Sequence, residues 1–532
     1  MKKNLFAFVI SILMIFCIIV TLMFTGCDKN EPTKPYVTPK NAKIQLRGDI
    51  VFLTATELAQ KIRSGELSSL EVVNAFLSQI YEYNPKLNAI VTLDAENAIN
   101  RAREADEALS KGEIWGPLHG VPITIKDNYA TKSIRTTSGY LPLTDVVPDF
   151  DATIVFRLKK AGAIILGKTN MPVLGMDIQT NNLIFGKTNN PWDLERTPGG
   201  STGGGAAAVA AGLSPLEMGN DLGGSIRIPS HFCGVFGLKP TENMVSLAGL
   251  APGMPKREFS AVRHMLSLGP LARSIEDLKL SFSIIAGVDF KDVNVPAIPI
   301  IYPEPKPLKM LRIAWTDNFP GVKVSNDTRV AMETLAEKLA AKGMTVEKVN
   351  PSGFDFTSAW KTWGNLSDME IGAHTPSYIR LMAYLFRSNP YMVFPFSHEK
   401  YLRVLTRRDN LISKMEEFLS NYDAWLCPVT IAPAFKHIIP EKWRGPYPIY
   451  KEDIIVDGES IDYYAANFAY TTIFNITGNP VVVMPIGYDQ SGLPIGVQVV
   501  GSRWQDASLL TVAEQLNKVG GDFRHPIGYK KD

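Results

Sequence analysis

Amphipathic helical segments alternate with short apolar runs along most of this 532-residue chain, and this alternation limits the fold more than any other feature. Apolar residues three and four positions apart predict helices, and short apolar runs bounded by turn residues predict buried strands. Helices interleaved with such strands are typical of an α/β layered architecture, in which helices cover a sheet. The predicted helices span residues 54–60, 69–83, 94–109, 153–161 and 329–342, and the predicted strands span residues 120–125, 163–166, 311–314, 479–485 and 495–500.

Composition excludes several classes of protein. Hydrophobic residues make up 45% of the chain and glycines number 41, as in a packed globular enzyme and unlike a disordered or fibrous chain. The 55 Lys and Arg residues nearly balance the 53 Asp and Glu residues, so the charge predicts no nucleic-acid partner. Neither a CxxC nor an HExxH spacing occurs, and the sequence therefore predicts no metal site. Cys233 and Cys427 lie far apart in apolar surroundings, which favours buried free thiols over a disulfide.

The first 27 residues have a composition of their own. Lys2 and Lys3 precede an apolar run that ends at Phe24, and two small residues separate this run from Cys27. A positive start followed by an apolar run is typical of an export signal. The small residues before Cys27 resemble the lipobox of bacterial lipoproteins, in which the cysteine is lipidated, although Phe24 stands where Leu is usual.

We interpret residues 1–27 as a signal or lipoprotein segment with Cys27 as the lipidation site, and an uncleaved anchor or a buried core helix are the alternatives. Both membrane interpretations keep the positive charge inside and place the rest of the chain on the extracytoplasmic face of the cell membrane. Residues 28–50 are rich in Lys, Asn and Pro and predict a tether. Residues 51–532 are then expected to form the folded domain.

Residues 197–229 carry the densest chemical signal, because the glycine-flanked Ser201 and Ser225 stand on either side of an alanine-rich helical piece. Glycines in this density let the backbone adopt positive φ and turn successive N–H groups into one concavity, as an anion or an oxyanion needs. A phosphate-binding loop is excluded because the GxxxxGK[ST] pattern is absent.

Three arrangements compete for a serine nucleophile. Residues 199–203 match the GxSxG elbow around Ser201, but Pro198 and glycines precede it where the elbow requires a strand. An SxxK pattern occurs at Ser358 and Ser397, without the SDN or KTG motif that would complete a β-lactamase-like site. None of the seven histidines stands in an obvious triad motif, so a lysine base becomes the better candidate.

Three stretches of the chain, in order, resemble the landmarks of the amidase signature family. They are residues 116–128 (GPLHGVPITIKDN), 198–204 (PGGSTGG) and 223–229 (GGSIRIP), and the resemblance extends from about residue 54 to residue 515. It implies an α/β/α layered sandwich around a mixed β-sheet. It also implies hydrolysis of a small-molecule carboxylic acid amide to acid and amine or ammonia through an acyl-enzyme, with no cofactor.

The resemblance implies a role for three side chains. Ser225 would be the nucleophile that forms the acyl-enzyme, Ser201 the bridging serine and Lys126 the base. A lysine accepts a proton only when it is neutral, which requires burial or a nearby cation to lower its pKa from about 10.4. Lys126 ends an apolar predicted strand, where such desolvation is expected.

The resemblance also implies features of the backbone. The N–H groups of Leu222, Gly223, Gly224 and Ser225 would form the oxyanion hole. A cis peptide bond would precede Ser201, where a glycine offers the least side-chain obstruction.

Several positions near these serines can be compared with the family pattern. Thr202 stands where a second serine is common, Asn220 where Ser or Thr is common, and Val173 where an acid is frequent. Asp221 and Arg227 fit the pattern and are expected to brace the nucleophile loop as a charge-assisted pair.

Two other functions compete with a simple hydrolase. The first is the amidotransferase subunit that releases ammonia from glutamine for aminoacyl-tRNA, against which the predicted export signal argues. The second is a catalytically silent binding protein, against which the intact Lys126, Ser201 and Ser225 argue. The aromatic-rich residues 355–462 predict either core packing or a lid that faces the substrate.

Overall fold

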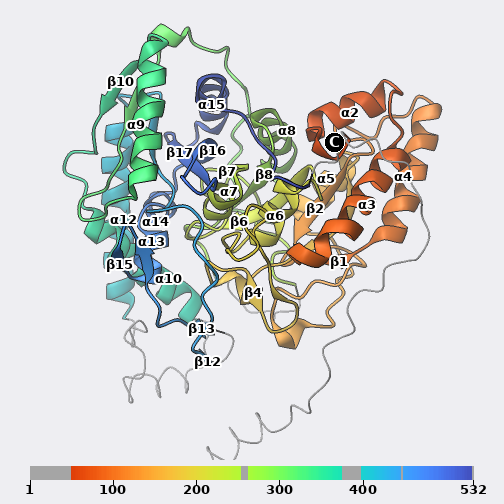
Figure 1. The fold of residues 1–532 in the computed structure, drawn as a ribbon, viewed down its shortest axis with the longest axis horizontal. Coiled ribbons are helices and arrows are strands. Elements are labelled where there is room, and N and C mark those ends of the chain that lie inside the picture. Colours follow the sequence, from red (N-terminus) through yellow and green to blue (C-terminus); the bar gives the residue numbers. More distant parts are fainter. Residues whose placement is uncertain (1–49, 253–261, 374–396, 445–446, 530–532) are drawn as a thin grey trace, which may run out of the picture. The chain divides into compact units, whose positions relative to one another are not determined.

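Eleven strands form one mixed sheet at the centre of the described chain (Figure 1). The computed structural model describes residues 50–252, 262–373, 397–444 and 447–529. In spatial order the strands are β1 (Ile90–Leu93), β3 (Ile164–Thr169), β2 (Pro122–Lys126), β6 (Leu216–Asp221), β8 (Ser267–Ala272), β7 (Phe236–Lys239), β16 (Val481–Tyr488), β17 (Pro494–Val500), β11 (Ala424–Pro428), β9 (Arg312–Trp315) and β10 (Thr345–Lys348).

Both parallel and antiparallel pairs occur in this sheet. Strands β3, β2 and β6 run parallel to one another, as do β11, β9 and β10, and the pairs between these two groups are antiparallel. Three two-stranded hairpins lie outside the sheet: β4 (Asn181–Asn182) with β5 (Gly186–Lys187), β12 (Lys442–Arg444) with β13 (Tyr447–Ile449), and β14 (Ile454–Val456) with β15 (Glu459–Ile461).

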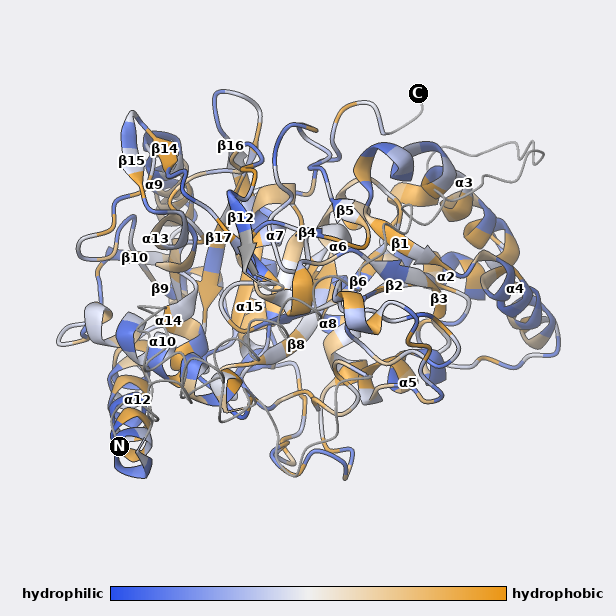
Figure 2. Cartoon of the chain, turned by 90° about the horizontal axis from the view of Figure 1, so that it is seen from below, coloured by the Kyte–Doolittle hydropathy of each residue, from blue (hydrophilic) through white to orange (hydrophobic). Residues whose placement is uncertain are grey.

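Helices pack on both faces of the sheet. The α-helices are α2 (Ala55–Arg63), α3 (Ser69–Leu87), α4 (Ala95–Ser110), α5 (Thr153–Lys160), α6 (Gly203–Ala210), α7 (Arg227–Cys233), α8 (Ile275–Ile285), α9 (Asn326–Ala341), α10 (Phe356–Gly372), α12 (His398–Leu419), α13 (Tyr463–Phe468), α14 (Thr472–Ile476) and α15 (Asp506–Gly520). Short 3-10 turns cover Ile50–Phe52, Leu141–Leu143, Val173–Gly175 and Leu308–Met310. Figure 2 shows hydrophobic colour on central strands such as β17 and hydrophilic colour on outer helices such as α4.

Alternating side chains divide the core between the two faces, because successive residues of a strand point in opposite directions. On β16, Val482 and Met484 join the cluster that contains residues of α8, α9 and α15, which we call the first face. Val481 joins a cluster with residues of α7, α10 and α14 on the second face. Helix α6 packs against α7 and so also covers the second face. The α/β/α layered sandwich around a mixed β-sheet is therefore confirmed.

Local signals in the sequence explain where several elements begin. Thr54 caps α2, since its hydroxyl accepts from Glu57 N at 3.1 Å while the Glu57 carboxylate accepts from Thr54 N at 2.8 Å. Strand β2 ends at Lys126, as the sequence predicts. Cys233 and Cys427 are both buried and free, which confirms the prediction against a disulfide.

Candidate active site

Lys126 and the Ser225 loop meet at one edge of the sheet. Strands β2 and β6 are parallel neighbours, so their carboxyl ends lie at the same edge. Lys126 is the last residue of β2, and Asp221, the last residue of β6, leads directly into residues 222–225. The sheet topology therefore joins two motifs that stand far apart in the sequence.

The amine of Lys126 is fully buried and hydrogen-bonded to three neutral groups. Its Nζ lies 2.7 Å from Ser201 Oγ, 3.1 Å from Thr202 Oγ1 and 2.6 Å from Asn220 Oδ1. Burial lowers the pKa of Lys126 to about 7, while the charges of Glu217 and Asp221 act in the opposite direction. The amine is thus available in its neutral form near neutral pH.

Ser201 follows a peptide bond that is cis, as the family resemblance implies. The preceding Gly200 has no room for a side chain, because a Cβ there would lie 2.6 Å from Ile178 O and 2.8 Å from Asp177 O. Helix α6 begins two residues after Ser201. The segment around Ile178 therefore packs directly against the backbone that presents the Ser201 hydroxyl to Lys126.

The loop that carries Ser225 lies beside Ser201. Thr202 N donates to Ser225 O at 3.1 Å, which links the two serine-bearing segments through their main chains. Ser225 is partly exposed, whereas Ser201 is buried. Of the two serines, Ser225 is consequently the one that solvent reaches.

Asp221 and Arg227 stabilise this loop as a charge-assisted pair, as expected. The two side chains form a buried pair, with Arg227 Nη2 2.8 Å from Asp221 Oδ1 and Arg227 Nε 3.0 Å from Oδ2. The carboxylate also accepts from Gly224 N at 2.9 Å and from Ile226 N at 3.0 Å. Burial opposes the charge of Asp221, but Arg227 outweighs it and holds the pKa of this carboxyl well below its usual range.

The backbone N–H groups of the loop divide into two kinds. The Gly224 N–H is already bound by Asp221. Within the described chain, the N–H groups of Leu222, Gly223 and Ser225 have no hydrogen-bond acceptor. Three unbound donors on four consecutive residues are what a developing oxyanion requires.

Two side chains whose contacts the sequence did not predict hold the carbonyl groups of this loop. Trp363 Nε1 donates to Leu222 O at 2.9 Å, and Thr471 Oγ1 donates to Gly223 O at 2.6 Å. Trp363 comes from α10, within the aromatic-rich segment that was expected to form core or lid. It does pack against the core, and it also contacts the predicted oxyanion loop. No local motif marks either residue, since each acts across a large sequence separation.

A second buried acid lies near Ser201. The Asp177 carboxylate accepts from Tyr450 Oη at 2.5 Å and from Tyr463 Oη at 2.8 Å. Burial raises the pKa of Asp177 to about 6, although the two tyrosine hydroxyls act to lower it. Its main-chain oxygen packs against Gly200, so this cluster ties residues 447–463 to the Ser201 segment.

The mixed sheet with helices on both faces, and the buried lysine beside two glycine-rich serine loops, define an α/β protein with an enzyme-like site. The Amidase family model matches residues 71–510, and the chain belongs to the amidase signature family.

Relatives cover nearly the whole described chain. A glutamyl-tRNA(Gln) amidotransferase subunit of Carboxydothermus hydrogenoformans is 33% identical over 507 residues, which cover 88% of this chain and 98% of that protein. The corresponding protein of Geobacillus thermodenitrificans is 34% identical over 500 residues, which cover 87% of this chain and 96% of that protein. The solved structure of 6-aminohexanoate cyclic dimer hydrolase matches with a TM-score of 0.73 at 27% identity, covering 90% of this chain and 99% of that one.

The expected location on the extracytoplasmic face of a membrane is wrong. That expectation rests on the apolar run of residues 1–27 alone. An exported location does not fit the glutamyl-tRNA(Gln) amidotransferase subunits that the chain resembles over 87–88% of its length. None of the helices in the described ranges has the length and apolar character that a membrane crossing needs. The predicted signal, the lipidation site Cys27 and all but the last residue of the tether lie outside the described residues.

Removing one member of the buried ion pair should be costly. Arg227→Met leaves Asp221 charged without its ionic partner, and we expect the free energy of unfolding to fall by about 3–5 kcal/mol. Urea denaturation of the wild type and the variant measures this difference. The double variant Asp221→Asn/Arg227→Met should regain part of the loss because it also removes the buried charge. An Arg227→Met variant as stable as the wild type would contradict the bracing role.

Proposed function

We propose that this chain hydrolyses a carboxylic acid amide to the acid and an amine or ammonia through an acyl-enzyme on Ser225. One observation carries the proposal: the fully buried amine of Lys126 is hydrogen-bonded to Ser201 and has only neutral hydrogen-bond partners. A lysine with a pKa near 7 is a base at neutral pH, whereas a solvated lysine is protonated there.

Ser201 relays protons between Ser225 and Lys126 in this mechanism. A neutral amine has two N–H donors and one lone pair. Asn220 Oδ1 and Thr202 Oγ1 accept the two N–H groups, which leaves the lone pair to accept from the Ser201 hydroxyl. As Ser225 Oγ attacks the carbonyl carbon, its proton passes to Ser201 and the Ser201 proton passes to Lys126.

The attack forms the Oγ–C bond and moves the carbonyl electrons onto oxygen. The unbound N–H groups of Leu222, Gly223 and Ser225 stabilise this oxyanion, while the Gly224 N–H keeps the loop anchored to Asp221. Collapse of the intermediate breaks the C–N bond, and the departing nitrogen takes a proton from Ser201, which Lys126 replaces. Water then attacks the acyl-enzyme through the same relay and releases the acid.

A second candidate is the hydrolysis of glutamine to supply ammonia. It is favoured by the similarity to the two glutamyl-tRNA(Gln) amidotransferase subunits, which extends over 96–98% of those proteins. In that case the chain would work within a larger assembly. The two candidates share the acyl-enzyme chemistry and differ in the substrate.

Loss of the nucleophile should abolish covalent modification. Ser225→Ala should eliminate labelling by a fluorophosphonate and all amide hydrolysis, because no oxygen remains to form the adduct. Ser201→Ala should keep some labelling, since the nucleophile itself is intact. Mass spectrometry locates the adduct in the wild type. An adduct on Ser201 would reverse the two roles.

The pH dependence should report Lys126. Because burial lowers its folded-state pKa to about 7, the base is protonated and inactive below that value, so activity should rise with pH along one acid limb through about 7 and then level off. Lys126→Arg should fold but lose nearly all turnover, since arginine stays protonated to beyond about pH 12. The measurement is a pH–rate profile of both enzymes, with circular dichroism to verify folding. Near-normal turnover of a folded Lys126→Arg enzyme would exclude lysine as the base.

A substrate panel separates the two candidates. If the chain is a glutamine-dependent subunit, the purified protein should release ammonia from glutamine in preference to simple aliphatic and aromatic amides. If it is a general amidase, simple amides should be hydrolysed at higher kcat/KM than glutamine. Ser225→Ala serves as the blank for both measurements, because any ammonia that it releases comes from a contaminant.

A further inference from the structure

Glu217 is a buried acid for which the mechanism above has no use. It lies in β6, whose residues are all buried, and Glu217 itself is completely buried. Strand β2 is the parallel neighbour of β6, and Glu217 is in register with Thr124, two residues before Lys126.

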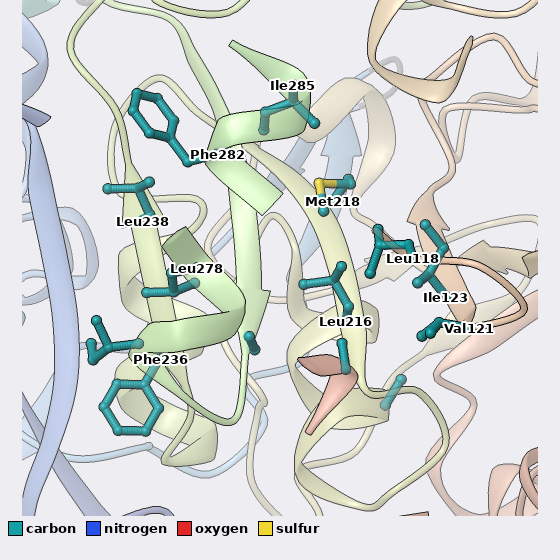
Figure 3. Close-up of a cluster of buried hydrophobic side chains, with 14 of the residues drawn as sticks. Leu118, Val121, Ile123, Leu216, Met218, Phe236, Leu238, Leu278, Phe282 and Ile285 are labelled. Atoms are coloured by element: carbon teal, nitrogen blue, oxygen red, sulfur yellow. The ribbon is translucent and has the colours of Figure 1, made fainter. Parts of the chain in front are cut away.

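The side chains of Glu217 and Lys126 lie on the same face of the sheet. Leu216 and Met218, which flank Glu217, point into the hydrophobic cluster of the first face with the α8 side chains (Figure 3). Ile123 and Ile125 of β2 join the same cluster. Because strand residues alternate in direction, Glu217 and Lys126 both point to the opposite, second face, beneath α6.

A hydrogen bond brings the acid toward the lysine. Thr169 Oγ1 donates to Glu217 Oε1 at 2.7 Å, and Thr169 is the residue of β3 in register with Lys126. The carboxyl of Glu217 thus reaches across β2 at the level of the lysine. Its second oxygen, Oε2, is buried and has no hydrogen-bond partner among the described residues.

Helix α6 is shaped to accept this side chain. A Cβ on Gly205, in the first turn of α6, would lie 2.3 Å from Glu217 Cγ and 2.5 Å from its Cδ. Only a glycine at this position leaves space for the acid. This turn begins two residues after Ser201, so Glu217 supports the segment that carries the proposed bridging serine.

We propose that Glu217 is a positioning residue whose charge sets the proton affinity of Lys126 during the reaction. This inference rests on the proposed role of Lys126 as the base. Glu217 acts through the lysine and touches neither the substrate nor the reacting atoms.

Few charged or titratable groups lie around Glu217, and Lys126 is one of them. They are Lys126 on β2, Lys168 on β3 and the Tyr129 hydroxyl after β2. Helix α6 contributes only glycine, alanine and valine, and β8 faces Glu217 with Leu271. Lys168 donates to Tyr129 O at 2.5 Å and shares its charge between Glu217 and the nearby Asp127.

Burial raises the pKa of Glu217 to about 7, which coincides with that of Lys126. In an apolar interior, burial of an isolated charge costs free energy, and a nearby opposite charge reduces that cost. A proton shared by the pair can therefore lie on the lysine, which gives a carboxylate and an ammonium, or on the acid, which gives a carboxylic acid and an amine. Both forms hold one proton, and the neutral form is the one in which Lys126 acts as a base.

Glu217→Gln tests this coupling because it keeps the shape and removes the charge. Without the carboxylate, protonated Lys126 loses its nearby opposite charge and its pKa falls further. The acid limb should move about one pH unit lower, giving roughly tenfold higher relative activity well below the wild-type midpoint. The readout is the rate of fluorophosphonate labelling of Ser225 as a function of pH, which needs no knowledge of the natural substrate. A limb that stays in place or moves to higher pH would overturn the inference.

Two further variants separate electrostatics from stability. Thr169→Val removes the hydroxyl that stabilises ionised Glu217, and it should move the limb in the same direction by a smaller amount even if Glu217→Gln does not fold. Asp277→Asn alters an equally buried acid that accepts from Ala55 N and Thr56 N at the start of α2. This control should lower stability and leave the limb where it is.

Failure of this inference is distinguishable from failure of the proposed function. If Lys126→Arg is inactive and the wild type shows the acid limb, but Glu217→Gln leaves it unmoved, only the role of Glu217 is wrong. If a folded Lys126→Arg enzyme retains activity, the lysine base itself is wrong and Glu217 loses its role with it.

Discussion

The site depends on keeping one amine away from water. The three hydrogen-bond partners of Lys126 are two hydroxyls and an amide oxygen, so none of them stabilises the charged form as a contacting carboxylate would. Desolvation then outweighs the nearby charges and lowers the pKa of Lys126 to about 7, so a large share of the amine is neutral at neutral pH. A carboxylate in direct contact would favour the protonated form of the lysine. The acid on the same face, Glu217, is bound by Thr169.

The order and direction of the strands bring the groups of the site together. The parallel pairing of β2 with β6 brings Lys126 and the Ser225 loop to one edge, and α6 packs on the same face with the Ser201 segment at its start. The Asp221–Arg227 pair then fixes the loop from within, and its desolvation cost is offset by several hydrogen bonds to each partner. Rigid donors that need no reorganisation are the form of oxyanion stabilisation that proteins use most effectively.

Local sequence patterns predicted individual residues of the site. The contacts between distant segments arise from tertiary packing and were not predicted. The apolar run before Lys126 predicted a buried strand with the lysine at its end, because both features are encoded within a few residues. Thr202 and Asn220 stood out only as departures from a family pattern, yet both contact the lysine amine. Trp363 and Thr471 could not be predicted, since nothing near them in the sequence indicates a contact with residues 222–223. The predicted membrane location was wrong because it was inferred from the hydrophobicity of residues 1–27 alone. That hydrophobicity carries no information about which proteins the folded domain resembles.

Burial alone does not single out Lys126, because Lys168 and Lys239 are also fully buried and burial lowers the pKa of each. What differs is the set of partners. Lys168 donates to Tyr129 O and to the hydroxyls of Thr131 and Thr136, and it lies near the Asp127 charge. Lys239 donates to Pro240 O among the charges of Asp221, Glu242 and Asp506. Main-chain carbonyls accept hydrogen bonds but cannot give up a proton, and the hydroxyls of Thr131 and Thr136 donate in turn to main-chain carbonyls. Among the described residues, these contacts therefore give neither Lys168 nor Lys239 a hydroxyl link to Ser225. Lys126 is bound to hydroxyls, which both donate and accept, and one of them belongs to the segment that contacts Ser225. The proposed role of Lys126 as the base therefore rests on the hydroxyl that links it to the Ser225 segment, with burial as the condition that lowers its pKa.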